Sequence, residues 1–450
     1  MNKQFLDLIN KYDLTGIGFS RKVTNDIQSK NPCVTFSVKS KKPTTELNEQ
    51  EIIPTSIEIN GIEYITDVIE QQQIELVACG SNNDNYQNFF PIEMDWQRTS
   101  HRPLVGGLSI ANFWDSFMYT GTMGQLCIDE RDGSVVGLTN AHVSNATQMI
   151  VTDPLDNTMT QPKFYTTYNK DIVQPSPSDA QRYYDNVPKR QEYLSQSGIG
   201  VVKRYWPVIS SGNTIDAALI SIKNDNTLVD NTDANSRSRA FSIKHIGETL
   251  IPWATPAQMA QLETDFMAGS SIYVTKSGRS TGITGSGYQA GSCPVTIQSI
   301  NYAFPLPLNN LYERIVAYED TFRFRYTDTA TYAHAPLDGG DSGSVLVTDY
   351  FDSTNGGSGT VIGLNFAGNG YNLDAISCKI TNVASILNVR GATLTDTSSS
   401  LKFGNPQNWN YIAAEHSDKI FQSTNVDLAT SGYIMVSGKK YWQIGNIPKP

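Results

Sequence analysis

Between residues 106 and about 387, this 450-residue chain consists of short strand-like runs separated by turns of Gly, Asn, Asp and Ser. No helical pattern alternates regularly with these runs, although residues 257–266 have the spacing of a single helix. A parallel α/β sheet needs a helix between successive strands, so this pattern predicts antiparallel strands in a sandwich or barrel. Strands are expected at residues 124–128, 135–139, 216–222, 271–275, 321–326, 344–347 and 361–364.

The first 95 residues have a different pattern. Residues 5–12 show helical spacing, and the turn Asn60-Gly61 joins two runs that alternate apolar and polar residues. Strand-like runs occur at residues 33–38, 56–59 and 62–68. Residues 81–100 are rich in Asn, Gln and Asp, which bury little surface, so a linker is expected there. The sequence thus predicts a small α+β domain ahead of the β-rich region.

After the β-rich region, a bridge rich in Thr and Ser leads to a final aromatic segment. Two strand-like runs flank Ser437-Gly438, which predicts a β-hairpin within residues 432–447. A chain of this length makes two or three domains. We expect the chain to divide into residues 1–95, 102–390 and 391–450.

Charge and apolar content restrict the partners. Hydrophobic residues make up 39% of the chain and charged residues 17%, which is typical of a globular protein. The chain has 34 Lys and Arg against 44 Asp and Glu, and its net charge of -10 repels nucleic-acid phosphates and anionic membranes. It has no apolar run of the roughly 18 residues that a membrane span needs, and no signal-peptide pattern. We therefore expect neither nucleic acid nor a membrane as a partner.

Cysteine and histidine patterns favour neither a metal site nor a disulfide framework. The five cysteines are odd in number, widely spaced and never in a C-x-x-C pair. This usage predicts small buried thiols in a reducing, cytoplasmic compartment. No histidine falls in H-E-x-x-H, so a zinc hydrolase is not supported. We expect no metal and no cofactor.

Three short motifs contain the residue types of a nucleophilic site. His142 lies in LTNAHV directly after a strand-like run, and Asp216 lies in TIDAALISI at the start of another. Ser342 lies in LDGGDSGSVLV, on a Gly-rich turn ahead of a strand. The three residues follow in the order His, Asp, Ser, with separations of 74 and 126 positions.

These residue types match the requirements of acyl transfer. A serine hydroxyl attacks only when an imidazole accepts its proton, and the imidazole needs a carboxylate on its other nitrogen to fix its tautomer. His142 would be the base, Asp216 the orienting acid and Ser342 the nucleophile. The glycines before Ser342 allow a tight turn in which the N–H groups of Gly340 and Ser342 converge on one oxyanion.

The combination of TNAHV and GDSGS, with IDAALI between them, resembles the trypsin-like, chymotrypsin-fold serine endopeptidases. GTMGQL at residues 121–126 resembles that family's first-barrel strand, and Asp341 matches its acid beside the serine. IGLNFAG at residues 362–368 resembles the strand that flanks the substrate backbone. The resemblance covers about residues 102–386. It implies a mainly β fold, a chymotrypsin-like double antiparallel β-barrel, and hydrolysis of a protein or peptide through an acyl-enzyme.

The front of the chain extends the resemblance. GIGF at residues 16–19, KSKKP at 39–43 and ITDVI at 65–69 resemble the corresponding region of bacterial and plant trypsin-like proteins that lack signal peptides. GRSTGITG at 278–285 resembles a strand of their second barrel. The C-terminal hairpin has no counterpart in the resemblance.

Several alternatives remain open from the residues alone. Four further aspartates lie between His142 and Ser342 and could replace Asp216: Asp153, Asp156, Asp185 and Asp225. RPLVGG at residues 102–107 has features of an activation site whose cleavage frees an amino terminus, although Pro103 disfavours cleavage there. GRSTGITGSG lacks the ending of a phosphate-binding loop, and GDSGS differs from the lipase motif G-x-S-x-G.

Specificity is only partly defined. Pro336 occupies the position where members that cleave after basic residues have an Asp, so cleavage after Lys or Arg is not implied. We expect a small or apolar side chain before the cleaved bond. The residues predicted to contact substrate are Pro336, Asp338, Asn365, Phe366 and Gly368. His334 is a further candidate for lining the pocket, whereas the other histidines outside the triad are expected to be structural or on the surface.

A second class of function is also open. The chain could be a noncatalytic or self-processing scaffold that uses its barrels for assembly, because an exposed strand edge can pair with another chain. A partner protein would then bind through the N-terminal domain or the C-terminal hairpin. We also expect the first 95 residues to shield or regulate the active site.

Overall fold

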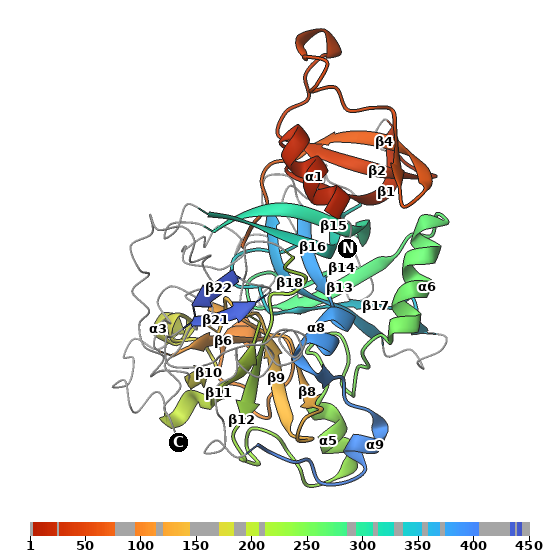
Figure 1. The fold of residues 1–450 in the computed structure, drawn as a ribbon. Coiled ribbons are helices and arrows are strands. Elements are labelled where there is room, and N and C mark those ends of the chain that lie inside the picture. The colour runs from red at the N-terminus through yellow and green to blue at the C-terminus, as the bar shows by residue number, and fades with distance from the viewer. Residues whose placement is uncertain are drawn as a thin grey trace.

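A computed structural model gives the arrangement of the chain, in which strands dominate (Figure 1). It describes residues 3–24, 27–76, 95–113, 120–144, 171–183, 195–206, 212–285, 294–308, 314–327, 336–352, 359–369 and 374–404, and the backbone of 433–436 and 439–442.

The first barrel is an eight-stranded antiparallel sheet that curls back on itself. Its strands, in spatial order, are β20 (Val389–Arg390), β8 (Gln125–Asp129), β9 (Val135–Thr139), β12 (Ala218–Ile222), β11 (Gly198–Tyr205), β10 (Asp171–Val173), β6 (Leu108–Asn112) and β7 (Thr120–Met123). Gly124 alone separates β7 from β8, and its N–H donates to the Leu138 carbonyl of β9 at 2.8 Å. The bend therefore brings β7, at one end of the sheet, beside β8 and β9 near the other end.

The second barrel closes through a direct strand pair. Its strands, in spatial order, are β14 (Gly282–Gly285), β13 (Tyr273–Gly278), β17 (Val345–Thr348), β18 (Thr360–Asn369), β19 (Asp374–Lys379), β16 (Arg314–Tyr326) and β15 (Val295–Leu308). β13 also pairs with β15 through Tyr273 opposite Thr296 and Val274 opposite Val295. This extra pairing joins β13, β17, β18, β19, β16 and β15 into a ring. The expected mainly β fold with two antiparallel barrels is confirmed.

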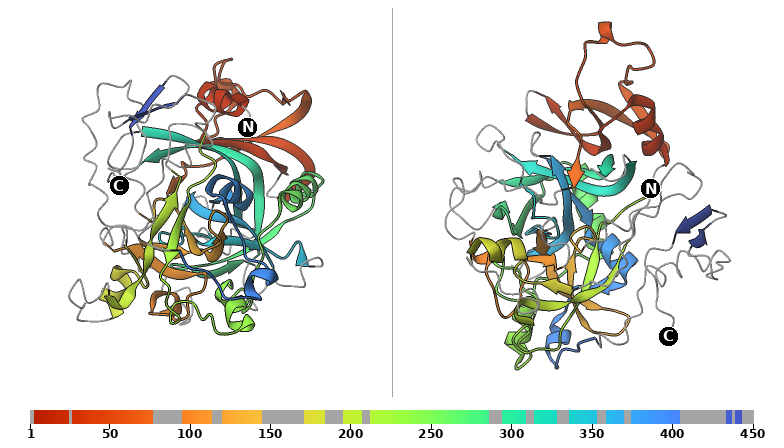
Figure 2. Two further views of the ribbon diagram at one scale, coloured as in Figure 1. Left: turned by 60° about the horizontal axis from the view of Figure 1, so that its bottom comes forward. Right: turned by 90° about the vertical axis from the view of Figure 1, so that its left-hand side faces the viewer.

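The N-terminal strands continue the sheet of the second barrel. They are β1 (Gly16–Thr24), β2 (Ile27–Val38), β3 (Ser56–Ile59), β4 (Ile62–Glu70) and β5 (Glu75–Leu76), with η1 at Thr44–Glu46. β1 pairs with β15, and α1 (Lys3–Tyr12) packs beside it (Figures 1 and 2). Asn60 and Gly61 both have positive φ, as the predicted turn between β3 and β4 requires. The expected small α+β region ahead of the barrels is confirmed.

One aromatic residue joins this region to the barrel. Tyr302 of β15 is fully buried, and its hydroxyl donates to Gln71 Oε1 at 2.9 Å. Its ring lies so close to β1 that a Cβ on Gly16 would be 1.8 Å from the Tyr302 hydroxyl oxygen. Only glycine allows this approach. The GIGF motif noted in the sequence is thus a packing surface for Tyr302.

The helices lie around the barrels and between strands. They are α2 (Asp95–Arg98), α3 (Pro177–Tyr183), α5 (Ala234–Ala240), α6 (Pro256–Met267), α8 (Ile380–Leu387) and α9 (Leu394–Thr397). α6 confirms the helix expected at residues 257–266, and Thr255 begins it with a capping box. α2 was not expected, because it lies inside the predicted linker. Trp96 holds this helix in place. Its ring centroid lies 3.8 Å from that of His101, and Lys244 Nζ lies over the Trp96 ring at 4.4 Å from its centroid.

Beyond the barrels, β21 (Tyr433–Val436) and β22 (Lys439–Trp442) form a separate antiparallel pair. They confirm the predicted C-terminal hairpin. Residues 81–94 of the predicted linker lie outside the described residues.

A buried carboxylate ties the first barrel to the end of α8. Asp129 is fully buried and accepts hydrogen bonds from Arg204 Nη1 and Nη2, each at 2.7 Å, while Lys203 Nζ lies 2.7 Å from it. Arg204 also donates to the Leu387 carbonyl at 2.7 Å. Burial acts to raise the pKa of Asp129, but the hydrogen bonds and charges of Arg204 and Lys203 outweigh it and hold the pKa below its usual value.

Asp129→Asn is therefore expected to lower the free energy of unfolding by about 3–5 kcal/mol at neutral pH, because it leaves buried cations uncompensated. The difference in unfolding free energy between wild type and Asp129→Asn should shrink as the pH falls below about 4. There the aspartate of the unfolded chain is protonated, so the stability that the lowered pKa of Asp129 provides is lost. Urea unfolding at several pH values measures it. Asp132→Asn is the control, because Asp132 is 45% exposed beside the same Lys203; an equal loss in both variants would contradict the account.

Candidate active site

His142 and Asp216 are held together at the end of two neighbouring strands of the first barrel. His142 follows β9, and Asp216 precedes β12. His142 Nδ1 lies 2.6 Å from Asp216 Oδ2, and the backbone N–H of His142 donates to Asp216 Oδ1 at 3.2 Å. Both residues are fully buried. One carboxylate therefore contacts the histidine at two points and fixes both the ring and its backbone.

The Asp216 backbone is also fixed, by contacts outside the strand ladder. Asn140 Nδ2 donates to the Asp216 carbonyl at 2.6 Å, and the Asp216 N–H donates to Cys378 Sγ of β19 at 3.2 Å. The sequence placed Asp216 at the start of the strand, but these bonds occupy its backbone and β12 begins at Ala218. Burial, followed by the charge of Asp216, raises the pKa of Cys378 well above its usual value. This cysteine is therefore a neutral thiol and a structural contact.

Ser342 lies on a sharp turn just before β17 of the second barrel. Gly340 and Gly343 on either side have φ of +99° and +93°, which side chains rarely adopt. The Ser342 carbonyl accepts from Thr122 N–H of β7 at 2.7 Å, and Gly343 N–H donates to the Asn365 carbonyl at 3.0 Å. The turn is thus fixed between the first barrel and β18.

The Ser342 hydroxyl does not bond to His142 in this structure. It donates to the Phe366 carbonyl at 3.3 Å, and the residues described offer no hydrogen-bond partner to His142 Nε2. The structure therefore brings His142 and Asp216 together directly. It places Ser342 on the adjoining turn, where a Cβ on Gly343 would lie 2.5 Å from Oγ1 of Thr139, three residues before His142.

The turn before Ser342 leaves amide donors free. Asp341 N–H donates to the Asp338 carbonyl at 2.9 Å, whereas the amides of Gly340 and Ser342 have no hydrogen bond within the described part of the chain. The Gly340 carbonyl accepts from Thr122 Oγ1 at 2.8 Å. A Cβ at Gly340 would lie 2.5 Å from Ser280 Oγ, so the position requires glycine for both space and conformation.

Asp341, beside the serine, is paired with a lysine that the sequence analysis did not identify. Lys276 Nζ lies 2.9 Å from Asp341 Oδ2, and both side chains are almost completely buried. Ser280 N–H and Thr281 N–H donate to Asp341 Oδ1 at 2.7 Å and 3.1 Å. Burial acts to raise the pKa of Asp341, but Lys276 and these hydrogen bonds hold it below its usual value.

This ion pair bears on the activation-site alternative. Asp341 has an internal cationic partner while the chain is continuous through residues 102–107. A freed amino terminus is therefore not needed to neutralise it, and these residues act as a connector between α2 and β6. The sequence does indicate that Lys276 is buried, because it follows the inward-facing Val274 by two positions on one strand, and alternate residues of a strand face the same side.

The predicted substrate-contact residues have different roles. Pro336 is buried, and its carbonyl accepts from Thr284 Oγ1 at 3.2 Å. Asp338 is partly buried, which raises its pKa. Asn365 is fully buried and donates to Ser344 Oγ at 3.1 Å, and the Phe366 ring is buried 4.8 Å from that of Tyr318. Both side chains face the core, whereas the Phe366 carbonyl faces Ser342. Contact of these two residues with substrate through the strand backbone stays a prediction.

Of the other candidates from the sequence, those that the structure describes lie apart from His142, Asp216 and Ser342. Asp225 is exposed and accepts from the Thr227 N–H of its own turn at 2.8 Å. GRSTGITG forms the hairpin between β13 and β14 rather than a phosphate loop. Five candidates lie outside the described residues: Asp153, Asp156, Asp185, His334 and His416.

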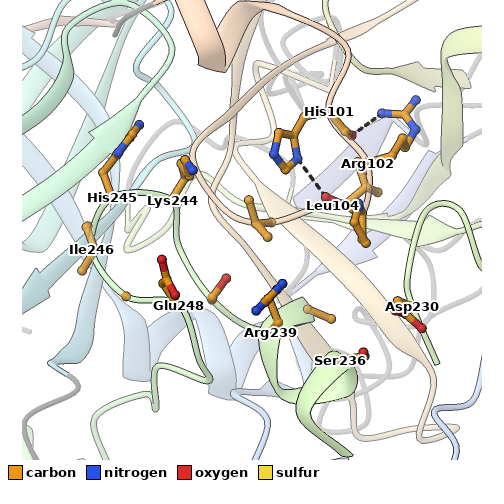
Figure 3. Close-up of a pocket in the computed structure, with 15 residues that line it drawn as sticks. His101, Arg102, Leu104, Asp230, Ser236, Arg239, Lys244, His245, Ile246 and Glu248 are labelled. Atoms are coloured by element: carbon orange, nitrogen blue, oxygen red, sulfur yellow. Dashed lines mark hydrogen bonds between the residues drawn. The ribbon is translucent and has the colours of Figure 1, made fainter. Parts of the chain in front are cut away.

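A separate cavity of about 640 Å³ lies beside the connector (Figure 3). Basic side chains outnumber acidic ones among its lining residues, which include His101, Arg102, Arg239, Lys244 and His245. His101 Nδ1 contacts the Pro103 carbonyl at 2.9 Å, and burial lowers its pKa. His142, Asp216 and Ser342 are not among its lining residues, so this cavity is separate from the candidate active site.

The described residues also lack a metal-binding cluster and a membrane-spanning helix. They contain no cluster of three or more His, Cys, Asp or Glu that could hold a metal ion. Among them there is also no helix of the length and apolar character that a membrane crossing requires.

No protein-family model matches the sequence, and no curated protein matches it. Solved structures that match include a glutamic acid specific serine protease, with 13% identity over 64% of this chain and 100% of that chain and a TM-score of 0.35. A Nocardiopsis protease matches with 16% identity over 64% and 98% and a TM-score of 0.33. Thermobifida fusca protease A matches with 16% identity, the same coverage and a TM-score of 0.32. These scores are too low to support an argument, and the fold follows from the strand pairing itself.

Proposed function

We propose that this protein is a serine endopeptidase that cleaves protein or peptide substrates through an acyl-enzyme. The observation that carries the proposal is the double contact of Asp216 with His142, which leaves Nε2 as the free nitrogen of the ring. General-base activation of a serine needs an imidazole that a carboxylate orients and a serine on a fixed turn nearby. His142, Asp216 and the Gly-rich turn of Ser342 supply these parts.

Catalysis would begin with a rotation of the Ser342 side chain. Its hydroxyl leaves the Phe366 carbonyl, turns toward His142 Nε2 and gives up its proton as Oγ attacks the scissile carbonyl. The imidazolium, stabilised by Asp216, then protonates the leaving amine, and the acyl group remains on Ser342. Water, deprotonated by His142, hydrolyses the ester and restores the serine. No cofactor takes part.

The free amides of Gly340 and Ser342 would stabilise the oxyanion. Their N–H groups belong to a turn fixed by Thr122, Asp341 and the positive φ of Gly340. Donors that are fixed before the reaction cost no reorganisation, and loss of one donor lowers kcat by about 10²–10³. Pro336 and Asp338, which lie just ahead of this turn, are the residues we assign to the border of the specificity pocket.

A fluorophosphonate probe tests the proposal, because it labels only an activated serine. Wild type should be labelled, and Ser342→Ala and His142→Ala should not be. A known serine protease treated in parallel shows that the probe is active. Labelling that persists in Ser342→Ala, or folded full-length wild type that stays unlabelled, would contradict the proposal and favour a noncatalytic scaffold.

A further inference from the structure

The short strand β5 occupies one edge of β18 beside the nucleophile. Leu76 lies opposite Ala367 and Glu75 opposite Gly368, in an antiparallel pair. β19 pairs with β18 from Gly363 to Asn369 along the other edge. β5 therefore lies on the same edge as β17, beyond the point where β17 ends its pairing at Leu364.

This edge starts at the residue next to the Ser342 contact. The Ser342 hydroxyl donates to the Phe366 carbonyl, and Ala367 is the next residue of β18. An extended peptide that presents a carbonyl to Ser342 can add to a free strand edge at this place by backbone hydrogen bonds. In this chain the edge is already paired, and its occupant is a segment from the N-terminal region.

Two anchors ahead of β5 in the chain hold it in place. Ile74 is fully buried in the core that contains the second-barrel residues. Gln71, also fully buried, donates its N–H to the Val38 carbonyl at 2.8 Å and accepts from the Tyr302 hydroxyl at 2.9 Å. Between these anchors and the pairing with β18, the segment has few strand bonds of its own, since β5 is only two residues long.

We propose that residues 71–76 are an internal inhibitory strand, which occupies the β18 edge that an extended peptide substrate would use. This proposal rests on the proposed function and adds a mode of regulation to it. Substrate hydrolysis then requires that β5 leaves the edge, so that only the fraction of molecules with a free edge binds extended peptides. A small acylating reagent needs Ser342 alone and is much less affected.

Ile74→Asp tests the proposal, because a charge in the core detaches the segment. The matched control is Ile62→Asp, since Ile62 is 56% exposed on the same N-terminal region. Two rates are measured on full-length protein: kcat/KM for tetrapeptide p-nitroanilides with a small or apolar residue before the cleaved bond, and fluorophosphonate labelling. Release of the edge should raise kcat/KM at least about 10-fold in Ile74→Asp, with labelling changed less than about 2-fold. Ile62→Asp should resemble wild type.

A second variant covers the case in which Ile74→Asp fails to fold. Glu75→Pro removes one backbone N–H from β5 and disfavours strand pairing, while Glu75 itself is exposed and leaves the core intact. It should raise kcat/KM in the same direction, and thermal unfolding checks that the fold is retained.

The outcomes separate this proposal from the function on which it rests. Labelling of wild type with unchanged kcat/KM in folded Glu75→Pro overturns the inhibitory strand and leaves the peptidase intact. A rise of equal size in Ile62→Asp also overturns it, because the effect would not depend on β5. Absence of labelling in wild type and in every variant contradicts the peptidase itself.

Discussion

Replacing Asp216 by Asn is expected to lower kcat for peptide hydrolysis by about 10⁴-fold, with little change in KM. Asp216 accepts from Nδ1 at 2.6 Å and from the backbone N–H of His142 at 3.2 Å. An amide of the same shape retains the position but favours the wrong tautomer of the ring and does not stabilise the imidazolium. Initial rates with a chromogenic peptide measure the effect.

The control for this variant is Asp225→Asn. Asp225 is one of the aspartates that the sequence left as an alternative, and it is exposed on a turn of its own. Its replacement should leave kcat within about 2-fold of wild type, because exposed charges away from the reaction contribute little. If both variants lost activity equally, or if Asp216→Asn retained full activity, Asp216 would not be the orienting acid.

Lys276→Met is expected to lower the free energy of unfolding by about 3–5 kcal/mol and to reduce kcat as well. The substitution leaves the Asp341 carboxylate buried without its cation. Asp341 also orders Ser280 and Thr281 by accepting from their N–H groups, and it is joined directly to Ser342. Urea unfolding and steady-state kinetics on the same preparation measure both losses.

The double variant Lys276→Met with Asp341→Asn separates charge from packing. Because it removes both charges, it should be more stable than Lys276→Met alone, which a double-mutant cycle detects as a coupling energy. Additive losses in the cycle would contradict the view that the two residues act as a pair.

The fold class and most strands could be predicted because they depend on local patterns. Alternation and turn residues predicted β9 and the β3–β4 hairpin, and the capping signal of Thr255 marks the start of α6. Barrel closure was expected only from the family resemblance, since the pairing of β13 with β15 joins strands through no local motif. α2 was missed because the anchor of Trp96 is a tertiary contact with His101 and Lys244.

The candidate site, like the fold, could be predicted only in part. His142, Asp216 and Ser342 could be proposed from short motifs, because each motif combines a reactive residue type with the turn or strand that holds it. Asn365 and Phe366 were expected to contact substrate, but the strand direction alone did not show that their side chains face the core. β5 could not be predicted from the sequence, since a strand of two residues shows no alternation of its own. Only its pairing with β18 defines it.

The central claim is that Ser342 carries an acyl group during turnover, and trapping that intermediate tests it most directly. A nitrophenyl ester is mixed with the enzyme, and the reaction is quenched in acid within the first turnover. The protein is then digested, and the masses of its peptides are measured by mass spectrometry. The account predicts a burst of nitrophenol equal to the enzyme concentration and one acylated peptide, modified at Ser342, that is absent from Ser342→Ala and accumulates more slowly in His142→Ala. An acyl group found on another residue, or turnover without any acylated peptide, would contradict it.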